Sequence, residues 1–130
     1  MSSHRETNTK CVLLVDDEAV VRRTCHRMLT RMGYEVLDAP DGAAAIHLYR
    51  QHWRSISVVL LDMFMPKMNG STTFQKLRQV NPDARVILSS GYPEDDTVNS
   101  LLGDPSVAFM RKPYGLKELM DTVHRVSVHA

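Results

Sequence analysis

VLLVDDE, residues 12–18, is an apolar run that ends in three acidic residues. Apolar residues without polar alternation are typical of a strand that is covered on both faces. From Glu18 on, apolar residues recur at helical spacing with arginines between them, and Gly33 is placed to end such a helix in the left-handed conformation. This part of the chain therefore predicts a buried strand followed by an amphipathic helix.

The order of strand and helix continues to the end of the chain. A helix is expected after Asp41, which can cap it, and another contains Phe74 and Leu77 and reaches about Val80. A weaker helix is expected at 94–102, and the inner stripe of a final helix is Leu116, Leu119, Met120 and Val123. The remaining strands are predicted at 34–37, 57–61, 85–89 and 107–110. Apolar strands joined by helix-length crossovers predict an α/β fold with a parallel sheet and helices on both faces.

The length and composition are those of one globular domain. The 130 residues are 43% hydrophobic, and 16 basic side chains against 15 acidic ones give a net charge of +1. This balance argues against direct nucleic-acid binding through bulk charge, and the apolar runs are too short to span a membrane. Residues 1–10 lack the apolar core of a secretory signal, so we expect a flexible tail there, a domain over 11–127 and a cytoplasmic location. Cys11 and Cys25 offer neither a disulfide framework nor zinc-site spacing.

Polar residues follow four of the predicted strands. Asp16-Asp17-Glu18 follows the first strand, Asp62 the third, Ser89-Ser90-Gly91 the fourth and Arg111-Lys112-Pro113 the fifth. In an open parallel sheet these strand ends lie at one edge, where ligands bind. Carboxylates held close together repel one another and favour Mg²⁺, which takes oxygen ligands and often shares its site with a phosphoryl group. The pattern predicts a phosphoryl–metal site in which a carboxylate is the acceptor.

The same residues resemble the receiver domain of two-component response regulators. Asp16-Asp17-Glu18 is similar to the acidic pair of that family, and residues 62–70, DMFMPKMNG, are similar to its phosphoacceptor loop. Ser90-Gly91 and Lys112-Pro113 match the family's hydroxyl residue and its lysine, whose bond to the proline is cis in the family. The surroundings of these last two motifs look most like receivers of hybrid histidine kinases. The resemblance implies a flavodoxin-like (βα)5 three-layer sandwich with a five-stranded parallel sheet of order 2-1-3-4-5.

The resemblance also implies a role for each site residue. Asp62 would accept a phosphoryl group from a histidine kinase or a phosphotransfer protein. Mg²⁺ would be bound by Asp17, Asp62 and the backbone carbonyl of Phe64, with Asp16 acting through water. Lys112 would pair with Asp62 at rest and with a phosphoryl oxygen afterwards. The chain would catalyse only its own phosphorylation and dephosphorylation, so we do not expect an enzyme that acts on other substrates.

A conformational switch is a further implication of the resemblance. Ser90 would bond to a phosphoryl oxygen and move towards it, and Phe109 would turn into the space that it leaves. The change would reach the surface formed by the helix at 94–102, the strand at 107–110 and the last helix. A downstream protein partner of unknown identity would bind there.

The lifetime of the phosphorylated state is implied by two positions in the family. The residues two beyond the phosphoacceptor and two beyond the hydroxyl residue flank the line along which water attacks. These places hold Phe64 and Tyr92, whose rings can obstruct the water. We therefore expect slow dephosphorylation for a receiver.

Other interpretations remain open from the sequence. Each motif alone has an ordinary structural explanation, such as a solvated loop or helix cap for Asp16-Asp17 and a core position for Phe109. An aspartyl-phosphate phosphohydrolase of similar α/β fold is the alternative function, although haloacid-dehalogenase-like enzymes place Asp-x-Asp after the first strand and this chain has Asp-Asp-Glu there. A flavin-binding domain would need a Ser/Thr/Gly-rich loop after the first strand, and none is present.

Overall fold

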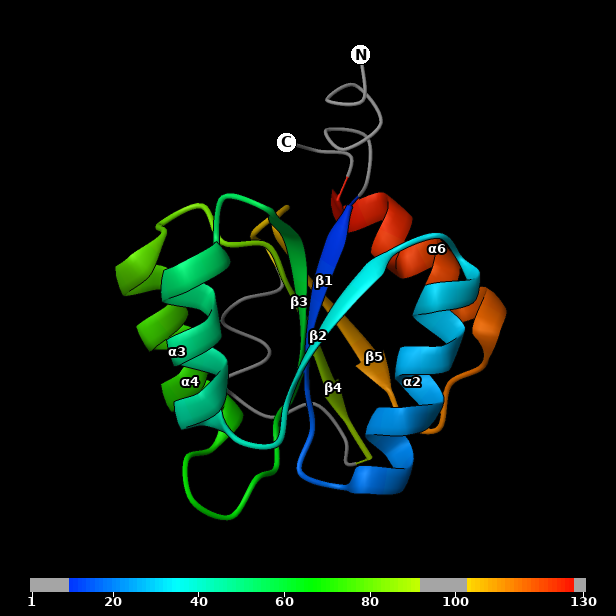
Figure 1. Cartoon of the computed structure of the whole chain (residues 1–130), viewed down its shortest axis with the longest axis horizontal. Helices are drawn as coiled ribbons and strands as arrows, with labels where there is room; N and C mark the ends of the chain where they lie inside the picture. The colour runs from blue at the N-terminus through cyan, green and yellow to red at the C-terminus, as the bar shows by residue number, and fades with distance from the viewer. Residues whose placement is uncertain (1–9, 92–102, 128–130) are drawn as a thin grey trace.

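Five parallel strands form one sheet in the computed structural model, which describes residues 10–91 and 103–127 (Figure 1). The order across the sheet is β2-β1-β3-β4-β5, so the predicted order is confirmed. Every neighbouring pair of strands is parallel. The strands are β1 (Cys11–Val15), β2 (Glu35–Ala39), β3 (Ile56–Asp62), β4 (Val86–Ser90) and β5 (Val107–Arg111).

Helices cover both faces of this sheet, as the apolar strands predict. On one face lie α2 (Ala19–Arg31) and α6 (Leu116–Ser127), and on the other lie α3 (Gly42–His52) and α4 (Gly70–Val80) (Figure 1). Among the described residues, no helix is both long and apolar enough to cross a membrane. The helix predicted at 94–102 and, apart from Lys10, the tail predicted at 1–10 lie outside the described residues.

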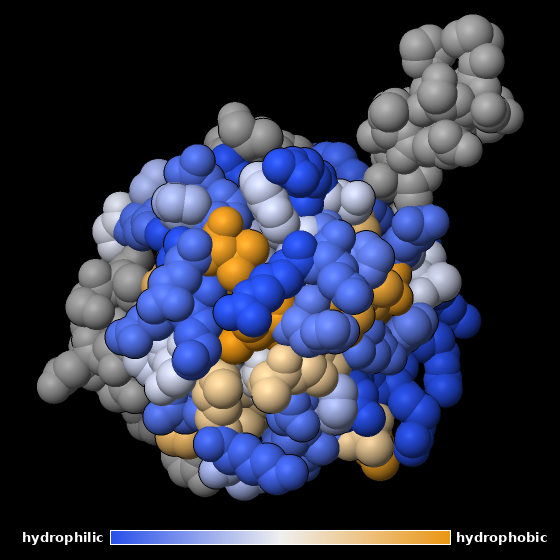
Figure 2. Space-filling model, turned by 60° about the vertical axis from the view of Figure 1, so that its left-hand side comes forward, coloured by the Kyte–Doolittle hydropathy of each residue, from blue (hydrophilic) through white to orange (hydrophobic). Residues whose placement is uncertain are grey.

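Successive side chains of a strand point to opposite faces of the sheet, so the strands contribute to two separate core clusters. In β3, Val59 and Leu61 face α3 and α4, whereas Val58 and Leu60 face α2 and α6. All four side chains are buried, which explains why these strands show no polar alternation in the sequence. Figure 2 shows the side of α3 and α4, where a limited apolar area is surrounded by polar side chains.

Two of the predicted helix boundaries have the expected local cause. Gly33 follows α2 with φ of 95°, a left-handed conformation that glycine adopts without steric cost. Asp41 precedes α3, and its side chain accepts a hydrogen bond of 2.8 Å from the backbone N–H of Ala44. This is the N-cap geometry that satisfies a free amide of the first turn.

The inner stripe predicted for the last helix is wrong at two of its four positions. Leu119 and Val123 are fully buried, but Leu116 and Met120 are each 43% exposed. The remaining buried face of α6 is completed by Thr122, Val126 and Ser127. Small polar residues thus share the buried face in place of Leu116 and Met120, because the helix is rotated about its axis relative to the stripe that large apolar residues alone suggest.

Candidate metal centre at the carboxyl edge of the sheet

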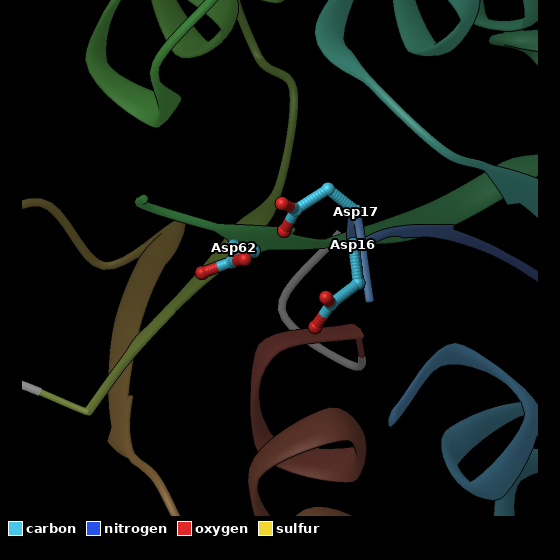
Figure 3. A group of neighbouring side chains, drawn as sticks. All are labelled: Asp16, Asp17 and Asp62. Carbon is cyan, nitrogen blue, oxygen red and sulfur yellow. The ribbon is translucent and has the colours of Figure 1, made fainter. Parts of the chain in front are cut away.

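Three aspartates gather where β1 and β3, the central neighbouring strands, end (Figure 3). Asp16 and Asp17 directly follow β1, and Asp62 is the last residue of β3. One carboxylate oxygen of each lies within 4.8 Å of the others. Asp16 and Asp62 are buried, with 3% and 4% of their surface exposed, while Asp17 is open to solvent. The edge of the sheet thus holds three acidic side chains that one ion could approach from solvent.

Backbone amides hold two of these carboxylates in place. The N–H of Glu18 donates to Asp16 Oδ1 at 2.9 Å, and the N–H of Phe64 donates to Asp62 Oδ1 at 3.2 Å. Because each bond spans only two residues, the chain after each strand turns tightly around its own aspartate. The orientation of both carboxylates is therefore fixed by local backbone, before any ion is bound.

Lys112 is the cation of the cluster, and its closest partner differs from the expected one. Its Nζ donates to Asp16 Oδ2 at 3.0 Å and lies 3.6 Å from Asp62 Oδ1. Burial alone would lower the pKa of Lys112, but the hydrogen bond to Asp16 and the charge of Asp62 outweigh burial and raise it. Lys112 thus stays charged between two carboxylates, and it bonds to Asp16 more closely than to Asp62.

Asp62 itself is unusually easy to protonate. Its pKa is raised from 3.8 to about 6, chiefly because burial disfavours the charged form. The nearby charge of Lys112 and the N–H of Phe64 lower this pKa, and the carboxylates of Asp16 and Asp17 raise it again. Lys112 and the N–H of Phe64 therefore offset only part of the cost of keeping Asp62 charged.

The donor set fits Mg²⁺. Carboxylate oxygens are the hard ligands that this ion takes, and the open side at Asp17 leaves room for the waters that it keeps. Both oxygens of Asp16 already accept hydrogen bonds, from Glu18 and Lys112, so direct ligation favours Asp17 and Asp62. That Asp16 acts through water stays a prediction.

Ser90 and Lys112 are brought to the same edge by strand register and a backbone hydrogen bond. Asp62 pairs with Ser89 across β3 and β4, so Ser90 lies one residue beyond the acidic strand end. Ser90 is 3% exposed, and its carbonyl oxygen accepts a 2.7 Å hydrogen bond from the N–H of Lys112. The Lys112–Pro113 bond that follows is cis, as the resemblance implies.

Two aromatic residues named from the sequence lie in different environments. Phe64 is 52% exposed beside Asp62. Phe109 is half-buried against the core cluster that faces α3 and α4, and it pairs in register with Leu88. Because every second side chain of a strand points to the same face, Leu88 and Ser90 of β4 lie on the same side of the sheet as Phe109. Tyr92 and the helix expected at 94–102 lie outside the described residues.

The loop after Asp62 is held closed by Gly70, the first residue of α4. The N–H of Gly70 donates to the carbonyl oxygen of Met63 at 2.9 Å. A Cβ at this position would lie 2.6 Å from Met63 Cα and 2.9 Å from the carbonyl oxygen of Asp62. The helix can begin this close to the acidic strand end only because residue 70 has no side chain.

Comparison with known proteins identifies the family of this chain. Residues 12–124 match the model of the response regulator receiver domain. The chain belongs to this family. The sensor kinase CckA of Brucella abortus (strain 2308) is 38% identical over 112 residues, which are 86% of this chain and 12% of that kinase. This receiver thus spans only a small part of that relative's length.

Solved receiver structures have the same fold over nearly their whole length. The receiver domain of the hybrid histidine kinase CckA is 32% identical, with a TM-score of 0.76 over 89% of this chain and 98% of that one. CheY in a CheX-CheY-BeF3-Mg²⁺ complex from Borrelia burgdorferi is 31% identical, with a TM-score of 0.80 over 93% of this chain and 90% of that one. These relatives give no support to the phosphohydrolase alternative.

Two contacts of this receiver were not anticipated from its sequence. One is the bond between Lys112 and Asp16, and the other is a hydrogen bond of 3.1 Å between Cys25 Sγ and the hydroxyl of Tyr114. The second pair is separated by 89 residues and carries no motif. No local pattern in the sequence could have indicated it.

Proposed function

We propose that this receiver accepts a phosphoryl group on Asp62 from a histidine kinase or a phosphotransfer protein. The observation that carries the proposal is a buried aspartate at the sheet edge, with carboxylate oxygens of Asp16 and Asp17 within 4.8 Å and the Nζ of Lys112 at 3.6 Å. The proposal is supported by the relatives, one a sensor kinase and another a receiver in complex with BeF3 and Mg²⁺. By this proposal the chain acts in the cytoplasm, its receiver spans 11–127 after a tail at 1–10, and it turns over no other substrate.

The transfer step follows from the chemistry of Asp62. One carboxylate oxygen attacks the phosphorus, so a new O–P bond forms as the P–N bond to the donor histidine breaks. The histidine nitrogen keeps the electron pair of that bond and later takes up a proton. Mg²⁺, when held by Asp17, Asp62 and the Phe64 carbonyl, supplies positive charge that offsets the charge of the carboxylates and of the transferring group.

Lys112 and Ser90 receive the phosphoryl oxygens in this proposal. Lys112 lies 3.0 Å from Asp16 and 3.6 Å from Asp62, so a short movement of its ammonium group brings it to a phosphoryl group on Asp62. Ser90 is at the end of β4, next to the acceptor strand. A cation and a hydroxyl that both bond to phosphoryl oxygens stabilise the charge that develops on the transferring group.

Acetyl phosphate tests the acceptor directly. Incubation with acetyl phosphate and Mg²⁺ should add one phosphoryl mass to the intact protein, and Asp62→Asn should abolish the addition. Asp41→Asn is the matched control, because Asp41 also follows a strand but caps α3. Equal labelling of the Asp62→Asn variant, or labelling at another residue, would contradict the proposal.

The output of the receiver is proposed to be a switched surface. Ser90 and Phe109 transmit the change to β5, α6 and the segment at 94–102, where a downstream protein binds; direct binding to nucleic acid or membrane is not part of the proposal. Beryllofluoride with Mg²⁺ mimics the phosphoryl group and should shift the backbone resonances of Ser90 and Phe109 more than those of α3. Shifts confined to the loop after Asp62 would show that no change is transmitted.

A further inference from the structure

The turn that carries Lys112 is short and is held at two points. It consists of residues 112–115, between the end of β5 at Arg111 and the start of α6 at Leu116. At its start the N–H of Lys112 donates to the carbonyl oxygen of Ser90 at 2.7 Å, which ties the turn to β4. Two residues later the hydroxyl of Tyr114 and the thiol of Cys25 share a hydrogen bond of 3.1 Å, in which either group can donate. This second contact ties the turn to the middle of α2.

Cys25 is buried and Tyr114 is half-buried beside the charged cluster. Cys25 is 3% exposed, and the ring of Tyr114 packs against the same core cluster as α2 and α6. Burial raises the pKa of both groups, so both stay neutral and the shared proton is kept. The charges of Asp16 and Lys112 act on the Cys25 thiol, which places the pair within electrostatic reach of the site.

A pocket borders this turn on the side of α2. A cavity of about 280 Å³ lies between α2 and the turn, and Lys112, Pro113, Tyr114 and Cys25 all line it. Side chains on the wall of a cavity lack contacts on the open side, so their position depends more on directional bonds. The hydrogen bond between Cys25 and Tyr114 crosses from α2 to the turn at this place.

We propose that Tyr114 is a positioning residue for phosphoryl transfer, because its hydrogen bond with Cys25 fixes the turn on α2 and holds Lys112 against Asp16 and Asp62. This inference rests on the proposed function of Asp62. The Nζ of Lys112 lies 3.0 Å from Asp16 and 3.6 Å from Asp62. A displacement of the turn by less than an ångström therefore changes which carboxylate is its closer partner. The hydroxyl of Tyr114 bonds to Cys25 and not to Asp62, so Tyr114 acts through the position of Lys112.

The test compares variants that remove or keep the bond. Tyr114→Phe and Cys25→Ala should each slow the labelling of Asp62 by acetyl phosphate at saturating Mg²⁺ by about tenfold. Cys25→Ser keeps a hydrogen-bonding group and should remain within about twofold of the parent, and the double variant Cys25→Ala/Tyr114→Phe should be no slower than either single variant. Tyr34→Phe is the matched control, since Tyr34 is a half-buried tyrosine on the same core cluster.

Two further measurements separate positioning from a general loss of structure. The affinity for Mg²⁺, followed by NMR at the amide of Asp17, should be unchanged in Tyr114→Phe. Hydrogen exchange of the Lys112 amide should be about tenfold faster in this variant, since that amide bonds to Ser90 at the base of the turn. Weakened Mg²⁺ binding together with slower labelling would show a structural defect and would overturn the positioning role.

The outcomes distinguish this inference from the function on which it rests. If the parent protein is not labelled, the proposed function of Asp62 is wrong. If the parent is labelled and Tyr114→Phe is labelled at the same rate, only the positioning role of Tyr114 is wrong. A slow Cys25→Ser variant that matches Cys25→Ala would also overturn that role, because the serine hydroxyl can replace the thiol in the bond.

Discussion

The junctions that follow β2 and β3 both contain an aspartate, but the two residues have different surroundings. Asp41 comes two residues after the end of β2, and its carboxylate accepts the N–H of Ala44 at the start of α3. Asp62 is the last residue of β3, and α4 begins only at Gly70, where Asn69 is the cap. A carboxylate at a helix N-terminus is stabilised by free amides and by the helix dipole, whereas Asp62 is buried beside two other carboxylates. An aspartate at the N-cap of a helix therefore stabilises the fold, whereas one buried among other carboxylates destabilises it.

The first junction, after β1, follows the pattern of β3. Glu18 occupies the N-cap position of α2 without a capping hydrogen bond from its side chain, and Asp16 instead accepts the N–H of Glu18. Both central strands thus leave their terminal carboxylates for the cluster, and the edge strand β2 does not. The fold thus places carboxylates that repel one another at the ends of the central strands.

The largest effect that we expect from this difference is that phosphoryl labelling of Asp62 depends on Mg²⁺. An anionic donor must approach three carboxylates, so removing Mg²⁺ with a chelator should slow labelling by about a hundredfold or more. Asp17→Asn should weaken Mg²⁺ binding, measured by calorimetry, more than Asp16→Asn does, because Asp16 is occupied by Lys112 and Glu18. Equal labelling in excess chelator would show that the cluster does not hold a metal for the transfer.

The next largest effect concerns the lifetime of the phosphoryl group. Phe64 is 52% exposed next to Asp62 and has no polar atom in its side chain to orient a water. Phe64→Asn should therefore speed dephosphorylation at saturating Mg²⁺ by about tenfold to a hundredfold. The rate is measured as loss of the phosphoryl mass over time, with Tyr92→Glu as the companion variant. The shielding idea fails if neither variant decays faster than the parent.

A smaller effect is expected in the stability of the metal-free protein. The folded state holds a proton on Asp62 more tightly than the unfolded chain does between pH 3.8 and about 6, so the free energy of unfolding falls as pH rises through this window. Asp62→Asn removes the buried charge and should be more stable than the parent at pH 7 by about 1–3 kcal/mol. Urea denaturation should show the difference shrinking towards pH 4. A constant difference across this range would mean that the charge of Asp62 is not the cause.

The smallest effect is expected at the junction after β2. Asp41→Ala removes the cap of α3 and should lower the free energy of unfolding by about 1 kcal/mol, with labelling of Asp62 unchanged. Asp41→Asn keeps the capping oxygen and should lose much less stability. Denaturation curves and acetyl phosphate labelling of the same preparations test both statements. Slower labelling in Asp41→Ala would show that the two junctions are not independent.

Sequence patterns predicted those structural features that a single residue or a short run of residues causes locally. Apolar runs predicted the strands, Gly33 and Asp41 predicted helix boundaries, and the acidic and basic strand ends predicted which residues meet at the edge. The rotation of α6 could not be predicted, since Thr122 is buried and Leu116 is exposed. The sequence also could not predict whether Lys112 bonds to Asp16 or to Asp62. The two distances from its Nζ, 3.0 Å to Asp16 and 3.6 Å to Asp62, differ by only 0.6 Å. Such differences arise from tertiary packing around the turn.

The contact between Gly70 and Met63 fixes the length of the acceptor loop. The loop of residues 63–69 begins at a strand end and returns to touch the backbone of that same end. An inserted or deleted residue would separate Gly70 from Met63 and move α4, so the loop cannot vary in length without cost to the site. It can vary in the side chains that point to solvent, and Phe64 is one of them. A point substitution at such a position can therefore change the surroundings of Asp62 while the backbone of the loop stays the same.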